Sequence, residues 1–225
     1  MPSPHNSAPH DSTAADASIN GRAAGTPAAA VIVPIRSFDG ALSRLESALG
    51  RSGCRQLMRR MAGRVLAAAD GLAVHVASDD AEVAAWAENR AASVVRVGRP
   101  GLTAAVTTAV RQLSAAGVER VVVAHADLAR ARSLRAVLGS GMVIAPDRRR
   151  DGSNVICVAA GAGFRFSYGP GSFQRHLSEA ERLGLAVTVL DDEDLAYDID
   201  HPEDLLELSD AERVALGVER HFVSL

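Results

Sequence analysis

Cysteine and aromatic residues are scarce in this chain of 225 residues, and it carries no excess of positive charge. The two cysteines, Cys54 and Cys157, lie far apart without a partner motif, which argues against a disulfide framework or a zinc site. Their scarcity makes the cytoplasm the expected compartment. A net charge of -3 gives no general reason to expect nucleic-acid binding, which relies on clustered cations. With aromatics at only 4%, the core must consist mainly of Ala, Val and Leu.

Long apolar runs are also missing from the first part of the sequence. Residues 1–27 are rich in Ala, Ser, Pro, His and Gly, so they match neither a secretory signal nor a membrane span. We expect a disordered tail over 1–27, one folded domain over 28–216 and a C-terminal extension over 217–225. The chain is long enough for one large α/β domain and too short for two comfortable ones.

Strand and helix patterns alternate along the remainder. The run from Ala28 to Ile35 is continuously apolar, as in a strand buried on both faces of a parallel sheet. Further strands are expected at 72–78, 93–97, 119–126, 142–145, 154–160 and 185–190, with the strand over 119–126 at the centre of the sheet. Helices are expected at 40–69 with a break at 50–53, and at 81–91, 102–116, 130–138, 173–183 and 202–216. This order predicts an α/β fold with a mostly parallel sheet and right-handed crossovers.

Acidic residues follow two of these segments. Asp127 comes where the central strand ends, and Asp198 and Asp200 stand two residues apart before the helix that Pro202 opens. Ligands of open α/β sheets gather at strand ends, and hard carboxylate oxygens suit Mg²⁺ that carries phosphates. Any one of these aspartates could instead cap a helix, but one helix needs only one cap.

Basic and glycine-rich segments could bind anions. Arg36 and Arg44 follow the first strand, and their guanidinium groups could hold a triphosphate, although surface arginines are common. The loops 151–154 and 169–172 could cradle a phosphate or carboxylate, or could be ordinary turns. His176, near the second loop, could be a packed histidine or a ligand. We interpret the run 148–150 as a solvated loop of arginines.

Taken in order, these pieces resemble the guanylyltransferases that make the activated three-carbon precursor of coenzyme F-420, acting on 2-phospho-L-lactate or phosphoenolpyruvate. The resemblance covers Val31 to about Leu208. It rests on the ordered segments VPIR, SRL, GLTAAV, ADL, DGSN, YGPGSFQRH and DIDHPEDL. It implies a single GT-A-like, Rossmann-type domain that binds GTP with Mg²⁺ and a phosphorylated three-carbon acid, without nucleic acid or membrane. An oligomer and a downstream transferase as partner are left open.

The resemblance also implies roles for individual residues. It makes Asp127, Asp198 and Asp200 the catalytic ligands of two Mg²⁺ ions. It places Ser153, Gly169 and Ser172 at the phosphate and carboxylate of the acceptor. We assign nucleotide binding to four residues: Arg36, Arg44, Asp79 and Thr103.

Three positions depart from the family pattern. Leu42 stands where a lysine is usual, Thr103 where an asparagine is usual and Ala129 where a proline is usual. Two other functions therefore stay open beside a diverged nucleotidyltransferase with another phosphorylated acceptor. One is a GT-A glycosyltransferase, since Asp198-Ile199-Asp200 is formally an Asp-x-Asp motif. The other is a nucleotide-binding paralogue without turnover.

Overall fold

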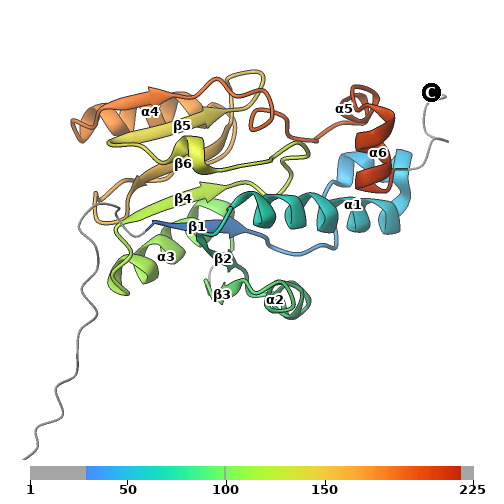
Figure 1. Ribbon diagram of the computed structural model, residues 1–225, viewed down its shortest axis with the longest axis horizontal. Coiled ribbons are helices and arrows are strands. Elements are labelled where there is room, and N and C mark those ends of the chain that lie inside the picture. Colours follow the sequence, from blue (N-terminus) through green and yellow to red (C-terminus); the bar gives the residue numbers. More distant parts are fainter. Residues whose placement is uncertain (1–28, 99, 219–225) are drawn as a thin grey trace, which may run out of the picture.

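A seven-stranded mixed sheet forms the centre of the computed structural model, which describes residues 29–98 and 100–218 (Figure 1). The strands are β1 (Ala29–Pro34), β2 (Ala73–Ala77), β3 (Ser93–Val95), β4 (Arg120–Ala124), β5 (Met142–Pro146), β6 (Ser153–Ala159) and β7 (Val187–Val189). The helices are α1 (Glu46–Ala68), α2 (Ala81–Glu88), α3 (Leu102–Ala115), α4 (Ser172–Arg182), α5 (Pro202–Leu206) and α6 (Asp210–Leu216). Two short 3-10 helices are η1 (Ser43–Leu45) and η2 (Arg135–Val137).

The strand order is β3-β2-β1-β4-β6-β5-β7. β6 runs antiparallel to β4 and β5, whereas the pairs β1–β2, β1–β4, β2–β3 and β5–β7 are parallel. The prediction of a mostly parallel sheet with a central strand after residue 119 is therefore confirmed. Because β6 runs in the opposite direction, its first residues lie beside the C-terminal ends of the parallel strands.

Helices cover both faces of the sheet, and β1 shows why its sequence is continuously apolar. Val31 and Val33 belong to the core under α1, α2 and α6, whereas Ala30 and Ile32 belong to the core under α3 and α4. Successive strand residues point to opposite faces, so a strand covered on both sides needs apolar residues throughout. No helix within the described ranges is long and apolar enough to cross a membrane.

The expected break in the first long helix is confirmed, since Gly50 interrupts α1 with a φ of 64° that glycine tolerates. Asp80 caps α2, and its side chain accepts hydrogen bonds from the N–H groups of Glu82 and Val83. Asp79 does not share in this cap. The proposed division into a tail, a domain and an extension stays a prediction, because residues 1–27 and 219–225 lie outside the described ranges.

Two predicted helices are wrong. The segment 130–138 forms only the short turn η2, because the N–H of Ala129 bonds to the carbonyl of Tyr197 and the N–H of Leu134 to that of Ala68. These distant carbonyls replace the partners that a helix would supply. The predicted helix 202–216 is two helices, because Ser209 and Glu212 form a capping box that starts α6 anew.

Candidate functional site

Two adjoining cavities open at the edge where β1, β2 and β4 end. Their volumes are about 700 Å³ and 490 Å³, and both are bordered by Pro34, Ile35 and Arg36 at the end of β1. The chain moves outward from β1 through β2 to β3 and then crosses back to β4 on the other side of β1. Such a reversal of strand order opens a crevice for ligands in α/β sheets.

The larger cavity has mostly apolar or backbone walls, with Asp79 at its border. Both carboxylate oxygens of Asp79 are engaged, because they accept hydrogen bonds of 2.8 Å from the N–H groups of Val97 and Gly98. Asp79 therefore shapes the wall by fixing the loop after β3. Its assignment to the nucleotide stays a prediction.

Thr103 lies at the start of α3, next to Leu102 in the cavity wall. Its hydroxyl accepts a hydrogen bond of 3.0 Å from the N–H of Tyr168. Thr103 thus connects α3 to the segment before the 169–172 loop. A contact between Thr103 and a nucleotide base stays a prediction.

The smaller cavity brings together Arg36, Arg44, Asp127 and Asp200 from distant parts of the sequence. Arg36 is exposed at the end of β1, and one guanidinium nitrogen of Arg44 lies 3.9 Å from a carboxylate oxygen of Asp200. Leu42 borders the same cavity with a φ of 57°, a left-handed conformation that is uncommon for leucine. Cations and carboxylates thus border one space.

Backbone pairing holds Asp127 beside Asp198. Leu128 and Asp198 form an isolated antiparallel bridge, flanked by a hydrogen bond of 3.3 Å from the N–H of Ile199 to the carbonyl of Asp127. The prediction that the chain brings these acidic segments together is met at the level of the backbone.

The electrostatics of this pair favour an added cation. Oδ1 of Asp127 is buried without a hydrogen-bond partner among the described residues. Burial and the charge of Asp200 raise the pKa of Asp127 to about 7. Burial and the charge of Asp127 likewise raise the pKa of Asp198 to about 6, although Asn154 offers it a long hydrogen bond of 3.4 Å. A cation between these groups would relieve the repulsion.

The described residues contain no group of three or more His, Cys, Asp or Glu side chains arranged to hold a metal ion. A ready-made shell of three carboxylates is therefore not formed. The donors still fit Mg²⁺, which is usually held by one or two carboxylates, waters and substrate phosphates. The unpartnered oxygen of Asp127 is the observation that supports this fit. Metal binding by Asp127, Asp198 and Asp200 stays a prediction.

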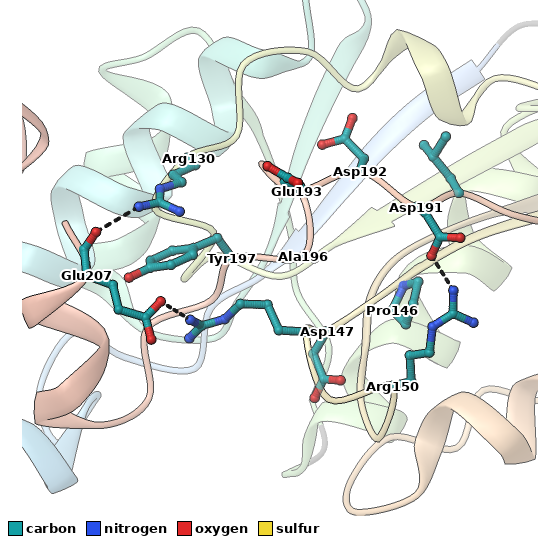
Figure 2. A pocket seen from close by; sticks show the side chains of 12 residues that line it. Arg130, Pro146, Asp147, Arg150, Asp191, Asp192, Glu193, Ala196, Tyr197 and Glu207 are labelled. Carbon is teal, nitrogen blue, oxygen red and sulfur yellow. Dashed lines mark hydrogen bonds and ion pairs between the residues drawn. The ribbon is translucent and has the colours of Figure 1, made fainter. Parts of the chain in front are cut away.

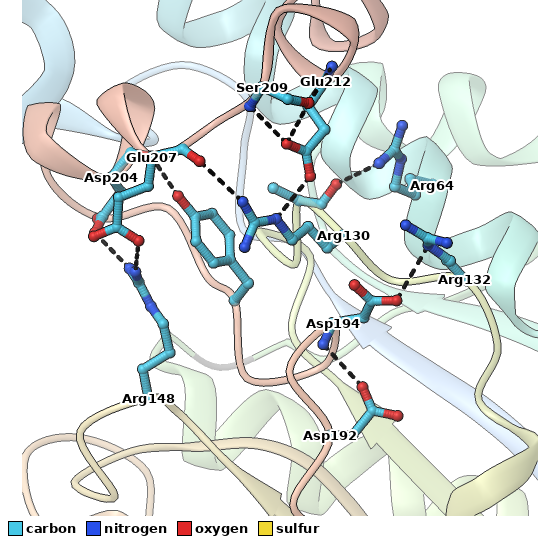
Figure 3. A network of polar contacts seen from close by, with 12 residues as sticks. Arg64, Arg130, Arg132, Arg148, Asp192, Asp194, Asp204, Glu207, Ser209 and Glu212 are labelled. Atoms are coloured by element: carbon cyan, nitrogen blue, oxygen red, sulfur yellow. Dashed lines mark hydrogen bonds and ion pairs between the residues drawn. The ribbon is translucent and has the colours of Figure 1, made fainter.

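A network of ion pairs supports the segment that carries Asp198 and Asp200. The guanidinium groups of Arg130 and Arg148 lie over the ring of Tyr197, at 3.7 Å and 4.2 Å from the ring centre. Figure 2 shows Arg130 beside this ring. Arg148 reaches Asp204 and Glu207, both at 2.5 Å (Figure 3). Figure 2 looks into a cavity of about 420 Å³. Two arginines that line it, Arg130 and Arg148, already form ion pairs with carboxylates.

Asp204 completes this support from the first turn of α5. Its buried carboxylate accepts hydrogen bonds from the N–H groups of Asp200 (2.9 Å) and His201 (2.7 Å) while it pairs with Arg148. Residues 148–150 are exposed, as the interpretation of a solvated loop requires, and Arg148 in addition pairs with Asp204 and Glu207. Its partners lie beyond residue 200, and a local run of arginines does not reveal them.

The three residues assigned to the acceptor meet where β6 and α4 begin. Ser153 and Ser172 are buried, and their hydroxyl oxygens lie 3.4 Å apart. Gly169 accepts a hydrogen bond of 2.9 Å from the N–H of Ser172 through its carbonyl, with a φ of 109°. Asp151 fixes the loop by accepting a hydrogen bond from the N–H of Gly171. The structure thus brings the two predicted loops together, and acceptor binding there stays a prediction.

Some residues around this site were not singled out from the sequence. Asn154 holds the carbonyl of Leu195 and approaches Asp198, and its place in the quoted DGSN segment was the available signal. Asp204 was visible only as an acidic residue in the first turn of a predicted helix. His176, which the sequence left undecided, is fully buried against Ser153.

Comparisons with known proteins identify the family of this chain. The family model described as "Guanylyl transferase CofC like" matches residues 29–210. A phosphoenolpyruvate guanylyltransferase of Rubrobacter xylanophilus is 35% identical over 187 residues, 79% of this chain and 91% of that protein. A 2-phospho-L-lactate guanylyltransferase of Halorubrum lacusprofundi is 39% identical over 52% of this chain and 56% of that protein.

The fold is similar to that of solved nucleotidyltransferases. A nucleotidyl transferase from Methanothermobacter superposes with a TM-score of 0.57 at 19% identity, covering 85% of this chain and 99% of that one. This likeness confirms the GT-A-like, Rossmann-type fold. Since the family model spans most of the described residues, the chain belongs to the CofC-like guanylyl transferases, a family of nucleotidyltransferases.

Proposed function

We propose that this protein joins the GMP part of GTP to the phosphate of phosphoenolpyruvate or 2-phospho-L-lactate and releases pyrophosphate, in the formation of coenzyme F-420. One observation carries the proposal: Arg36, Arg44, Asp127 and Asp200 border one cavity at the reversal of strand order. Membership of the family supports the guanylyl group. The names of the relatives support the two acceptors.

The nucleotide would span the two adjoining cavities. The apolar walls of the larger one suit a nucleoside, with Asp79 and Thr103 on that side. Arg36 and Arg44 would bind the triphosphate, because guanidinium groups fork onto phosphate oxygens. Arg44 is held near Asp200 and His201, so its charge already points into the smaller cavity.

Asp127, Asp198 and Asp200 would hold two Mg²⁺ ions. Bound Mg²⁺ would supply charge neutralisation for the phosphates during transfer. The chain's own contribution is to keep Asp127 and Asp198 side by side through the bridge at Leu128. Asn154 and Asp204 add to this by fixing the two ends of the acidic segment.

Ser153, Gly169 and Ser172 would hold the phosphate and carboxylate of the acceptor. A phosphate oxygen of the acceptor attacks the α-phosphorus of GTP, and the bond from that phosphorus to the bridging oxygen of pyrophosphate breaks. The attacking phosphate is already ionised, so no general base is required. Positioning and charge neutralisation supply most of the rate in phosphoryl transfer.

We further propose a cytoplasmic location, which the two buried, unpaired cysteines support. A homo-oligomer and a downstream transferase that takes the product are proposed partners. Size-exclusion chromatography with light scattering, with and without the product, would test the oligomer.

The direct test is to incubate the protein with GTP, Mg²⁺ and one acid at a time: phosphoenolpyruvate, 2-phospho-L-lactate or 3-phosphoglycerate. Pyrophosphate release that requires both GTP and an acid is the expected result, and mass spectrometry should find the GMP adduct of that acid. No pyrophosphate with any of the acids would refute the proposal. Thermal stabilisation by UDP-sugars but not by GTP would favour a glycosyltransferase, and GTP binding without product would favour a paralogue without turnover.

A further inference from the structure

The hydroxyl of Ser153 is hydrogen-bonded to a buried histidine, His176. His176 lies on α4 with no exposed surface, and its Nδ1 is 2.9 Å from Oγ of Ser153. On the other side of the ring, Nε2 accepts a hydrogen bond of 2.8 Å from the N–H of Ser167. The imidazole therefore joins the proposed acceptor site to the segment before the 169–172 loop.

These two contacts determine where the imidazole proton lies. A backbone N–H can only donate, so Nε2 of His176 must be the unprotonated nitrogen. Burial and the nearby charge of Arg175 lower the pKa of His176 to about 4, which keeps the ring neutral near pH 7. The one ring proton is then on Nδ1, and Nδ1–H donates to Oγ of Ser153.

The aromatic residues around His176 fix the orientation of its ring. Tyr168, Phe164 and Phe166 lie 5.1, 5.8 and 6.3 Å from the imidazole, measured between ring centres. With packing on this side and hydrogen bonds on both nitrogens, a flip of the ring would place a ring C–H against the N–H of Ser167, and the other tautomer would place N–H against N–H there. The direction of the Nδ1–H bond is thus built into the fold.

Ser153 is left with a proton to donate. Its oxygen accepts from His176, and its other described side-chain contact, the hydroxyl of Ser172 at 3.4 Å, is too long for a strong bond between hydroxyls. A hydroxyl that accepts on one side can donate on another. An anionic oxygen of a bound acid would satisfy this donor.

We propose that His176 is a positioning residue for the acceptor: its Nδ1–H holds Ser153 so that the serine proton points to an anionic oxygen of the phosphorylated acid. The inference rests on the proposed function, because it takes Ser153 as an acceptor contact. It differs from a purely structural role, in which His176 would serve only to satisfy Ser167 and fill the core.

Two conservative variants separate these roles. The side-chain amide of His176→Asn reaches the position of Nδ1, so it can still donate to Ser153 but offers nothing to Ser167. The amide of His176→Gln reaches the position of Nε2, so its oxygen can accept from Ser167 while the donor to Ser153 is lost. Each variant thus keeps one of the two hydrogen bonds.

The experiment measures kcat and KM for GTP and for phosphoenolpyruvate with the full chain. His176→Gln should raise the KM for phosphoenolpyruvate about tenfold, the typical worth of one hydrogen bond to a charged group, with the KM for GTP unchanged. His176→Asn should stay within about threefold of the unsubstituted protein. Equal effects of the two variants, or an effect on GTP alone, would overturn the proposal.

A double-substitution cycle tests whether His176 acts through Ser153. Adding His176→Gln to Ser153→Ala should cause no further rise in the KM for phosphoenolpyruvate, because the group it orients is already gone. Additive effects would show that His176 acts independently and would overturn the proposal.

A readout without turnover separates this inference from the proposed function. In the ¹⁵N-labelled protein, NMR of the His176 imidazole should show that Nδ1 is protonated and Nε2 is unprotonated. The opposite tautomer would refute the inference. Calorimetric titration of phosphoenolpyruvate should show weaker binding to His176→Gln than to His176→Asn, and equal affinities would also refute it. If phosphoenolpyruvate binds in this pattern but no guanylyl transfer occurs with any acid, only the proposed function fails.

Discussion

Around Tyr197 two arginines form ion pairs with acids, whereas around His176 the buried hydrogen bonds join neutral groups. In the first region Arg130 and Arg148 enclose the tyrosine ring and pair with acids, and Arg148 is about one-third exposed. In the second, His176 is buried between Ser153 and Ser167. Exposed ion pairs tolerate the entry of ions and are screened by salt, whereas buried neutral bonds are directional. The ion pairs support the segment that carries Asp198 and Asp200, whereas the neutral hydrogen bonds hold Ser153.

The largest expected effect is at Asp127, which lies beside the segment that the ion pairs support. Asp127→Asn should lower kcat by two or more powers of ten, by analogy with the removal of preorganised charge stabilisation, and should leave the KM for phosphoenolpyruvate nearly unchanged. Steady-state kinetics would measure both. Asp191→Asn is the control, because Asp191 is exposed and pairs with Arg150 away from the two adjoining cavities. A rise in the acceptor KM alone would contradict the division between the two regions.

The next effect concerns the support of the acidic segment. Asp204→Ala removes a buried acceptor of two backbone N–H groups and leaves Arg148 without its buried partner. The free energy of unfolding should fall by about 3 kcal/mol. Glu207→Ala is the matched control, since it removes the exposed partner of the same arginine and should cost under about 0.5 kcal/mol. Similar losses in urea denaturation would show that burial does not distinguish the two acids.

A smaller effect sharpens the comparison through pH. Because the pKa of Asp127 is raised to about 7 in the metal-free fold, the folded chain keeps a proton that the unfolded chain loses near pH 4. The unfolded form then binds fewer protons, so stability falls as pH rises from about 4 to 7. In EDTA, Asp127→Asn should match the unsubstituted protein near pH 4 and melt a few degrees higher at pH 8. Parallel melting profiles would contradict the repulsion described at this site.

The smallest effect adds charge where the family pattern has it. Leu42 borders the cavity with Arg36 and Arg44, so Leu42→Lys should lower the KM for GTP about two- to fivefold, as expected of one partly exposed ion pair. Leu42→Ala, which shortens the side chain without adding charge, should show no such gain. An unchanged KM in the lysine variant would place the triphosphate away from this wall.

Sequence patterns predicted the sheet well because its central strands β1, β4, β6 and β5 are buried on both faces. The continuous apolar run of β1 follows from cores on either side of it. The helix expected at 130–138 failed because Tyr197 and Ala68 bond to that backbone, and a local pattern contains no sign of either. The start of α6 was visible as Ser209-Asp210-Ala211-Glu212, a capping box inside an otherwise helical pattern.

The candidate site was predictable in its members but less so in its geometry. Family resemblance selected Asp127 and Asp198, and the bridge through Leu128 explains why they meet. Asp79 and Thr103 were assigned to the nucleotide, and the structure gives each of them backbone partners as well. The position of the Arg148 side chain depends on its contacts with Tyr197 and Asp204, which are distant from it in the sequence.

The bridge between Leu128 and Asp198 also has a consequence for the order of synthesis. A ribosome releases the residues of β1 to β6 before it releases the segment that pairs with Leu128, and chains fold from the N-terminus as they emerge. A nascent chain can therefore assemble most of its sheet while Asp127 still lacks its acidic neighbour. Translation that stops short of residue 198 would leave Asp127 without Asp198 and Asp200.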